Sequence, residues 1–158
     1  MKEKIKVFAG SIFISLAVGG LSAFFTRNSM GLYNDIVRPS LSPPSWLFPV
    51  VWTVLFILMG ISAAIIYLNK TAPKSQINSA LFTYGLSLIV NFFWSIIFFN
   101  LRAFLFATIW ILLLLYLIIR TIIKYYKIDK TAAFLQIPYL VWVSFATYLT
   151  FAIWYLNR

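Results

Sequence analysis

The sequence contains no cysteine, no histidine and only three carboxylate side chains. Without cysteine and histidine the chain has no disulfides, no thiol or imidazole catalysis, and few of the ligands that hold zinc and haem iron in proteins. The carboxylates are Glu3, Asp35 and Asp129, and none lies inside an apolar run. A carboxylate relay for protons through a membrane therefore lacks its parts. We expect no metal site and no cofactor.

Apolar residues dominate the rest of the composition. Of the 158 residues, 63% are hydrophobic and 20% are aromatic, and the mean hydropathy is +0.94. A soluble domain is only about half apolar, and a chain of this size has too little interior to bury more. The composition therefore predicts an integral membrane protein that is solvated by lipid.

Five apolar runs are long enough to cross the hydrocarbon core of a bilayer, which takes about 20 helical residues. They lie near residues 5–26, 46–68, 79–100, 103–124 and 131–156. The predicted fold is an all-α membrane protein with one domain over residues 1–158, a bundle of five transmembrane helices. The first run also fits a signal peptide, because lysines precede it, although it is long for one.

Small residues recur every fourth position in the first run, at Ser11, Ser15, Gly19 and Ala23. This spacing places them on one helix face, where small side chains let two helix backbones approach closely within a membrane. The face fits packing against another helix of the same chain, and it also fits the seam of a homodimer.

The chain is basic, with 13 Lys and Arg residues against three carboxylates and a net charge of +10. The basic residues lie at the ends of the runs, and no aromatic-basic motif for RNA or DNA appears, so we expect the bilayer rather than nucleic acid as partner. Nine of them fall on one side of the predicted topology: Lys2, Lys4, Lys6, Lys70, Lys74, Arg120, Lys124, Lys127 and Lys130. This asymmetry predicts a cytoplasmic N-terminus.

The first connection, residues 27–45, is the longest and is rich in proline. Pro39, Pro43 and Pro44 fix their own φ angles and hold the preceding residues extended, so the segment is stiff. We expect Ser45 to cap the helix that follows. A stiff connection fits a lid over the outer mouth of the bundle, and a plain spacer is the alternative.

Indole, amide and hydroxyl groups fall on shared helix faces in three runs. The pairs are Trp52 and Phe56, Asn91 and Trp94, and Trp142 and Ala146. Asn91 is the only amide near the middle of a run, and an unpaired amide in hydrocarbon costs roughly 2–7 kcal/mol, so it must face a partner inside the bundle. Pro138 cannot continue the hydrogen-bond ladder of the fifth helix, which we expect to kink there. The three faces predict an indole-walled pocket for a flat, mostly apolar ligand, whereas each tryptophan alone also fits an interfacial anchor.

Three stretches together resemble the signature motifs of one family. They are RPSLSPPSWLFPVVWTVLFILMG at residues 38–60, NFFWSIIFF at residues 91–99 and IPYLVWVSFATYL at residues 137–149. With the five runs and the chain length, they resemble the translocator protein family (TspO/MBR), also called the tryptophan-rich sensory protein or peripheral-type benzodiazepine receptor family. The resemblance covers essentially the whole chain.

The resemblance implies a five-helix bundle, often a homodimer, whose first loop covers a ligand pocket. It implies porphyrins such as protoporphyrin IX as ligands, sterols in animal members, and synthetic benzodiazepine-type or isoquinoline compounds. By motif position the contacts would be Tyr33, Pro43, Trp52, Asn91, Trp94, Trp142 and Ala146. The sequence departs from the family where Val90 replaces a common tryptophan and Thr150 a frequent asparagine, and the fourth helix lacks a frequent acidic residue. Ligand preference therefore need not match that of other members.

We expect a membrane-bound porphyrin-binding translocator or sensor protein in a bacterial plasma membrane. The ligand would stack on Trp52 and Trp142, and its carboxylates would meet Arg27 or Arg38. One alternative is light- and oxygen-dependent porphyrin breakdown, in which Trp52 and Trp142 would act because no other catalytic group is present. Another is a passive transporter of porphyrins or sterol-like lipids. A cholesterol-type motif matches the chain twice and carries little weight.

Overall fold

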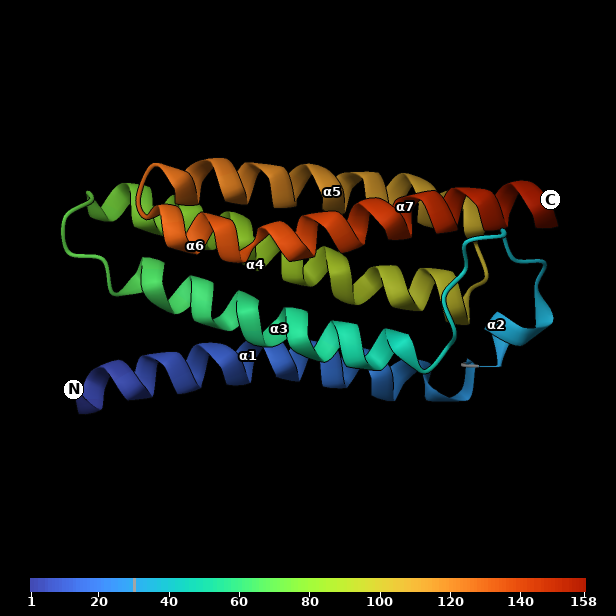
Figure 1. The fold of residues 1–158 in the computed structure, drawn as a ribbon, viewed down its shortest axis with the longest axis horizontal. Helices are drawn as coiled ribbons and strands as arrows, with labels where there is room; N and C mark the ends of the chain where they lie inside the picture. Colours follow the sequence, from blue (N-terminus) through green and yellow to red (C-terminus); the bar gives the residue numbers. More distant parts are fainter. Residues whose placement is uncertain (30) are drawn as a thin grey trace.

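The computed structural model describes residues 1–29 and 31–158, and all its secondary structure is helical. The long helices are α1 (Lys2–Thr26), α3 (Leu47–Tyr67), α4 (Lys74–Ser95), α5 (Phe104–Tyr126) and α7 (Ile137–Asn157). The shorter ones are α2 (Leu32–Asp35) and α6 (Lys130–Leu135), with a 3₁₀ turn η1 (Arg27–Ser29) and a π-helical segment η2 (Ile96–Asn100). The long helices run side by side, and the two termini lie at opposite ends of the bundle (Figure 1).

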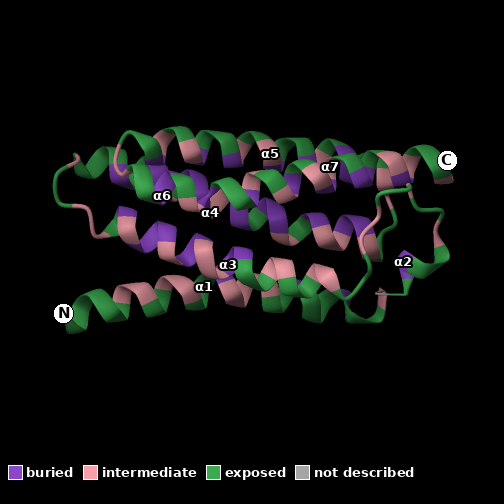
Figure 2. Cartoon of the chain, viewed as in Figure 1, coloured by how far each residue is buried: buried purple, intermediate pink, exposed green. Residues whose placement is uncertain are grey.

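Among the described residues, five helical segments are long and apolar enough to cross a membrane, in agreement with the five predicted spans. Large apolar side chains cover the outer surface, among them Phe13, Phe82, Ile109 and Val141. Figure 2 shows the same arrangement, with exposed residues along the outer faces of the helices. An outward-facing apolar surface of this kind is what lipid requires, and the helices satisfy their backbone hydrogen bonds internally.

Two predicted boundaries need correction. α4 begins at Lys74, five residues before the predicted span, because polar residues outside the hydrocarbon continue the helix after Pro73. Ser45 does not cap α3, since the helix starts at Leu47 and no side chain caps it. A backbone hydrogen bond from Leu47 N to Pro44 O makes the turn into the helix instead, at 3.0 Å.

The fifth span is interrupted between α6 and α7, as the position of Pro138 predicts. The proline ring cannot donate to the carbonyl of Phe134 and would clash with it, so α6 ends at Leu135 and α7 starts at Ile137. Gln136 lies at the break and is fully buried, and within the described part of the chain neither its amide nitrogen nor its amide oxygen has a hydrogen-bond partner. The break therefore places an unsatisfied amide group inside the bundle.

The small-residue face of α1 packs against α3 within the chain. The Ser11 hydroxyl donates to the Gly60 carbonyl at 2.7 Å, and the Ser15 hydroxyl donates to the Phe56 carbonyl at 2.6 Å. A Cβ atom on Gly60 would lie 2.5 Å from the Cα of Ile12, so only glycine permits this approach. The structure therefore shows the small-residue face of α1 packed against α3 of the same chain, so α1 is part of the bundle.

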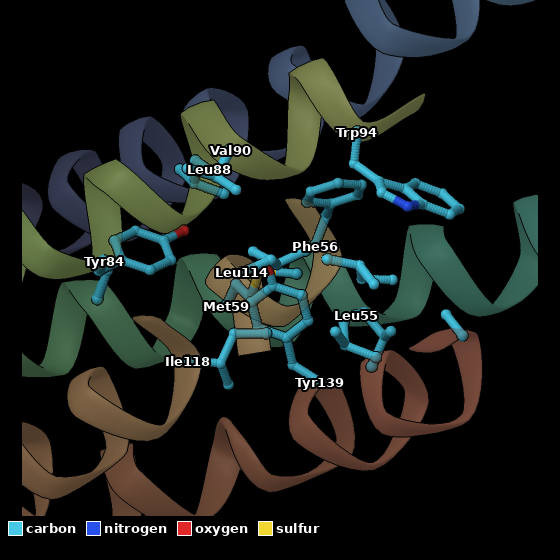
Figure 3. Packing of buried hydrophobic residues seen from close by; sticks show 14 of the residues in the cluster. Leu55, Phe56, Met59, Tyr84, Leu88, Val90, Trp94, Leu114, Ile118 and Tyr139 are labelled. Atoms are coloured by element: carbon cyan, nitrogen blue, oxygen red, sulfur yellow. The ribbon is translucent and has the colours of Figure 1, made fainter. Parts of the chain in front are cut away.

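The half of the bundle near the N-terminus, here called the packed half, has a tightly filled interior. Met59, Ala64, Ile66 and Ile118 are each 0% exposed. Figure 3 shows part of this interior, with Met59 and Ile118 among side chains from several helices. The other half, here called the hollow half, contains the cavity described next.

Candidate ligand-binding cavity

A cavity of about 380 Å³ lies in the hollow half, between α1, α3, α4 and α7. Ligand pockets in proteins commonly measure about 300–1,000 Å³ and are lined mainly by apolar and aromatic side chains. Aromatic residues from three of these helices form much of this wall, and small residues of α1 form another part. The cavity thus has the size and the lining of a site for a small, mostly apolar molecule.

Seven of the eight residues predicted from the sequence line this cavity. They are Tyr33, Trp52, Phe56, Asn91, Trp94, Trp142 and Ala146. The eighth, Pro43, is not part of the wall, but its carbonyl accepts a hydrogen bond of 2.6 Å from the Tyr33 hydroxyl. The structure therefore brings together residues that lie more than a hundred positions apart in the chain.

The aromatic side chains contact one another around the cavity. Trp52 stacks on Phe56 with the ring centroids 5.6 Å apart and the planes at 29°, and its edge meets Tyr139 at 6.3 Å. On α7, Trp142 meets the ring of Phe48 at 5.8 Å. Such offset and edge contacts fix the rings relative to one another, so the wall presents flat apolar surfaces in defined orientations.

Two indole N–H groups of the wall have no hydrogen-bond partner among the residues that the structure describes. The Nε1 atoms of Trp94 and Trp142 are both buried and unpaired, whereas the Nε1 atom of Trp110 donates to the Val90 carbonyl at 2.7 Å. A buried donor left without an acceptor costs about 1–3 kcal/mol. The cavity wall therefore contains two buried polar atoms without a partner, and in the function proposed below an acceptor atom of the ligand would pair with them.

Asn91 finds a partner inside the bundle, as its position in the sequence predicts. It is 4% exposed, and its amide nitrogen donates to the Tyr139 hydroxyl at 3.0 Å. Tyr139 is a residue that the sequence analysis did not single out. Its position three residues before Trp142, on the same face of the helix, was the available signal.

The first connection lies at the same end of the bundle as the C-terminus (Figure 1), and its residue Tyr33 lines the cavity. Tyr33 of α2 is buried and reaches the cavity, and its ring also meets Phe48 at 5.3 Å. The guanidinium carbon of Arg38 lies 4.6 Å above the centroid of the same ring. A single tyrosine thus links the cavity wall to a cation on the first connection.

A paired hydrogen bond holds the connection to the end of α7. The Asn157 side chain accepts from Val37 N at 2.9 Å and donates to Val37 O at 2.8 Å. Near the start of the connection, the Ser29 hydroxyl donates to the Asn100 side chain at 2.7 Å. Neither asparagine was predicted, because nothing in a one-dimensional pattern pairs them with the loop.

The side of the cavity between α1 and α3 is not sealed. Gly20 and Ala23 of α1, and Pro49 and Thr53 of α3, line the cavity and are also exposed on the outer surface. Nothing lies within 4 Å of the position that a Cβ atom on Gly20 would take. The cavity therefore communicates with the surroundings of the bundle through this side.

A bundle of five apolar helices around an indole-walled cavity defines an α-helical integral membrane protein with an internal site of ligand size. The model of the TspO/MBR family matches residues 11–156, and the chain belongs to this family. This confirms the resemblance seen in the three motifs.

Several curated relatives are similar over most of their length. The chain is 39% identical to tryptophan-rich protein TspO of Chlorobaculum tepidum, over 99% of both chains. It is 30% identical to protein CrtK of Rhodobacter capsulatus, over 97% of this chain and 94% of the relative. It is also 30% identical to the translocator protein of Homo sapiens, over 84% of this chain and 79% of the relative.

Proposed function

We propose that this protein binds a tetrapyrrole, such as protoporphyrin IX, in the cavity of the hollow half. The observation that carries the proposal is the wall itself, which combines flat aromatic faces with two unpaired indole donors, Trp94 and Trp142. A porphyrin is flat and largely apolar, and its polar atoms are confined to the ring centre and the rim. These properties match what the wall offers.

Each wall residue has a proposed role. Trp52 and Trp142 would contact the faces of the macrocycle, with Phe56 and Ala146 filling the apolar remainder of the wall. Asn91 would supply a fixed polar point, because its amide group is oriented by Tyr139. Benzodiazepine-type or isoquinoline compounds would use the same apolar surface.

The carboxylates of a porphyrin would lie toward the end of the cavity at Tyr33. Arg38 lies directly above Tyr33, which is part of the wall, so its guanidinium is placed to meet a carboxylate there. Arg27 is less suited, because its Nη1 atom already donates to the Phe24 carbonyl at 2.6 Å. Pro43 would act through Tyr33, whose hydroxyl it holds.

The double variant Trp94→Phe/Trp142→Phe tests the proposal. It removes both unpaired donors and keeps two aromatic rings in the wall. Protoporphyrin IX is titrated in the dark into purified protein, so that light-dependent breakdown does not enter, and quenching of the remaining tryptophan fluorescence is measured. Two lost hydrogen bonds predict a dissociation constant raised about ten-fold or more.

Trp154→Phe is the matched control, because Trp154 lies on α7 as Trp142 does but does not line the cavity. We expect its dissociation constant to equal that of the unaltered protein. Circular dichroism confirms that each variant keeps its helices. An unchanged dissociation constant in the folded double variant would exclude this cavity as the porphyrin site.

We also propose that the protein resides in a bacterial plasma membrane with its N-terminus in the cytoplasm. The nine Lys and Arg residues on the N-terminal side of the bundle support this orientation. A homodimer, which the family resemblance implies, remains a prediction. The α1 face of Ser11 and Ser15 is not available as its seam, because α3 covers that face.

A further inference from the structure

Lys124, near the end of α5, has an unusual environment for a lysine. Its ammonium donates to the hydroxyls of Ser79 and Thr83 on α4, both at 2.8 Å. The side chain is half-buried, and Thr83 is 6% exposed. An ammonium has three N–H donors, so two are taken by neutral hydroxyls and one is left for another acceptor. The charge itself is not neutralised by these contacts.

Two more cations share this face of α5. At 100° per residue, Arg120, Lys124 and Lys127 fall within about 60° of one another around the helix, and they span roughly 10 Å along its axis. Arg120 and Lys127 are exposed. The one ion pair among the described residues joins Arg102 and Asp35 at the opposite end of the bundle. The three cations therefore form a stripe without a protein counterion.

The depth of the stripe indicates what neutralises it. Arg120 lies six residues before the end of α5, which places it about 9 Å from that end. Each headgroup layer of a bilayer is about 5–8 Å thick, so with the end of α5 at the outer edge of that layer the stripe would extend from the headgroups to the edge of the hydrocarbon. A soluble anion reaches that depth poorly, whereas the phosphate of a lipid is already located there.

We propose that the surface formed by α4 and α5 around Lys124, at the N-terminal end of the bundle, binds the headgroup of an anionic phospholipid. Its phosphate would accept from Arg120, whose planar guanidinium suits two oxygens of one phosphate. Lys124 would donate its third N–H and is held in place by Ser79 and Thr83. Lys127 would meet the outer part of the headgroup. This inference does not depend on what the cavity binds.

The test measures lipid selectivity with spin-labelled phosphatidylglycerol and spin-labelled phosphatidylcholine. The full chain is reconstituted in phosphatidylcholine vesicles, and electron paramagnetic resonance gives the motionally restricted fraction of each label. We expect phosphatidylglycerol to be preferred. Arg120→Gln/Lys124→Gln should reduce the relative association constant by about five-fold for each cation removed.

Lys2→Gln/Lys4→Gln is the matched control, because it removes two charges from the same end of the bundle but on α1, and not on the helix that carries the stripe. We expect a much smaller change in selectivity. An equal loss in both double variants would overturn the proposal, because it would show only a general attraction of anionic lipid to a basic surface.

Ser79→Ala/Thr83→Val keeps every charge and removes only the hydroxyls that hold Lys124. We expect roughly a two-fold loss of selectivity, because the ammonium is no longer positioned. Unchanged selectivity in this variant would show that the two hydroxyls do not position Lys124 for the headgroup, and it would overturn the proposal. The last measurement adds inorganic phosphate to the vesicles. If phosphate displaces the labelled phosphatidylglycerol, the site binds free phosphate and the assignment to lipid is wrong.

Discussion

The two halves of this bundle use the same kinds of residues to opposite effect. In the packed half, Gly60 lets α1 approach α3 until Ile12 fills the space, and the neighbouring side chains are fully buried. In the hollow half, Gly19 also belongs to the α1–α3 contact, but its neighbour Phe56 borders the cavity. Glycine therefore permits close packing of α1 on α3 in the packed half, whereas in the hollow half it contacts a side chain that borders the cavity.

The largest effect is expected from Gly60→Ala. Its Cβ atom would lie 2.5 Å from the Cα and 2.8 Å from the N of Ile12, and a backbone cannot move aside locally. We expect the free energy of unfolding to fall by about 3 kcal/mol or more, at the upper end of the range for overpacking, and α1 to separate from α3. Thermal unfolding in detergent, followed by circular dichroism, measures this loss.

Two other glycines make the comparison specific. A Cβ atom on Gly19 would lie 2.5 Å from the Phe56 ring, which can swing into the cavity, so Gly19→Ala should cost less stability and should weaken ligand binding instead. Gly85 has nothing within 4 Å of its Cβ position, so Gly85→Ala should leave stability unchanged or raise it by up to about 1 kcal/mol. If Gly60→Ala and Gly85→Ala behave alike, the close α1–α3 contact does not contribute to stability.

A smaller effect is expected where the two halves meet. Asn91→Leu would leave the buried Tyr139 hydroxyl without its donor, at a cost of about 1–3 kcal/mol. The double variant Asn91→Leu/Tyr139→Phe removes both polar groups, and we expect it to recover most of the lost stability. Urea unfolding of the two variants measures the difference. A double variant no more stable than the single one would show that the pair does not interact.

The smallest effect on stability is expected at the first connection. Asn157→Ala removes the two hydrogen bonds to Val37, and both are exposed, so the global free energy of unfolding should change by less than about 1 kcal/mol. Local opening should increase instead, because no other hydrogen bond among the described residues joins Val37 to α7. Amide hydrogen exchange of residues 36–38 measures it, with Asn34→Ala on the same connection as control. Equal exchange in both variants would show that the hydrogen bonds between Asn157 and Val37 do not hold the connection to α7.

Much of the fold follows from simple features of the sequence. The lengths of the apolar runs predict five spans, and the missing N–H of Pro138 predicts the interruption of the last one. The start of α4 was missed because hydropathy detects the part of a helix that lies in lipid, and Lys74 lies outside it. The π-helical segment Ile96–Asn100 was missed because its sequence is as apolar as the helix before it.

The cavity residues, too, could be predicted only in part from the sequence. Helix periodicity identified the faces of Trp52, Asn91 and Trp142, because a residue type repeated every three or four positions marks one side of a helix. Periodicity does not show which atom on another helix forms a hydrogen bond with a given polar group. The pairing of Asn91 with Tyr139, and the lack of any partner for the indole of Trp142, required the packing of helices against one another.

The unsealed wall at Gly20 and Thr53 has a consequence for every affinity measured on this protein. Acyl chains and detergent tails are present at enormous excess and can occupy the same volume through that side. An apparent dissociation constant therefore measures how readily the ligand replaces an acyl chain or a detergent tail in the cavity. It does not measure binding to an empty cavity. Values for different compounds are comparable only in one medium, and a change of detergent alone should reorder weak binders.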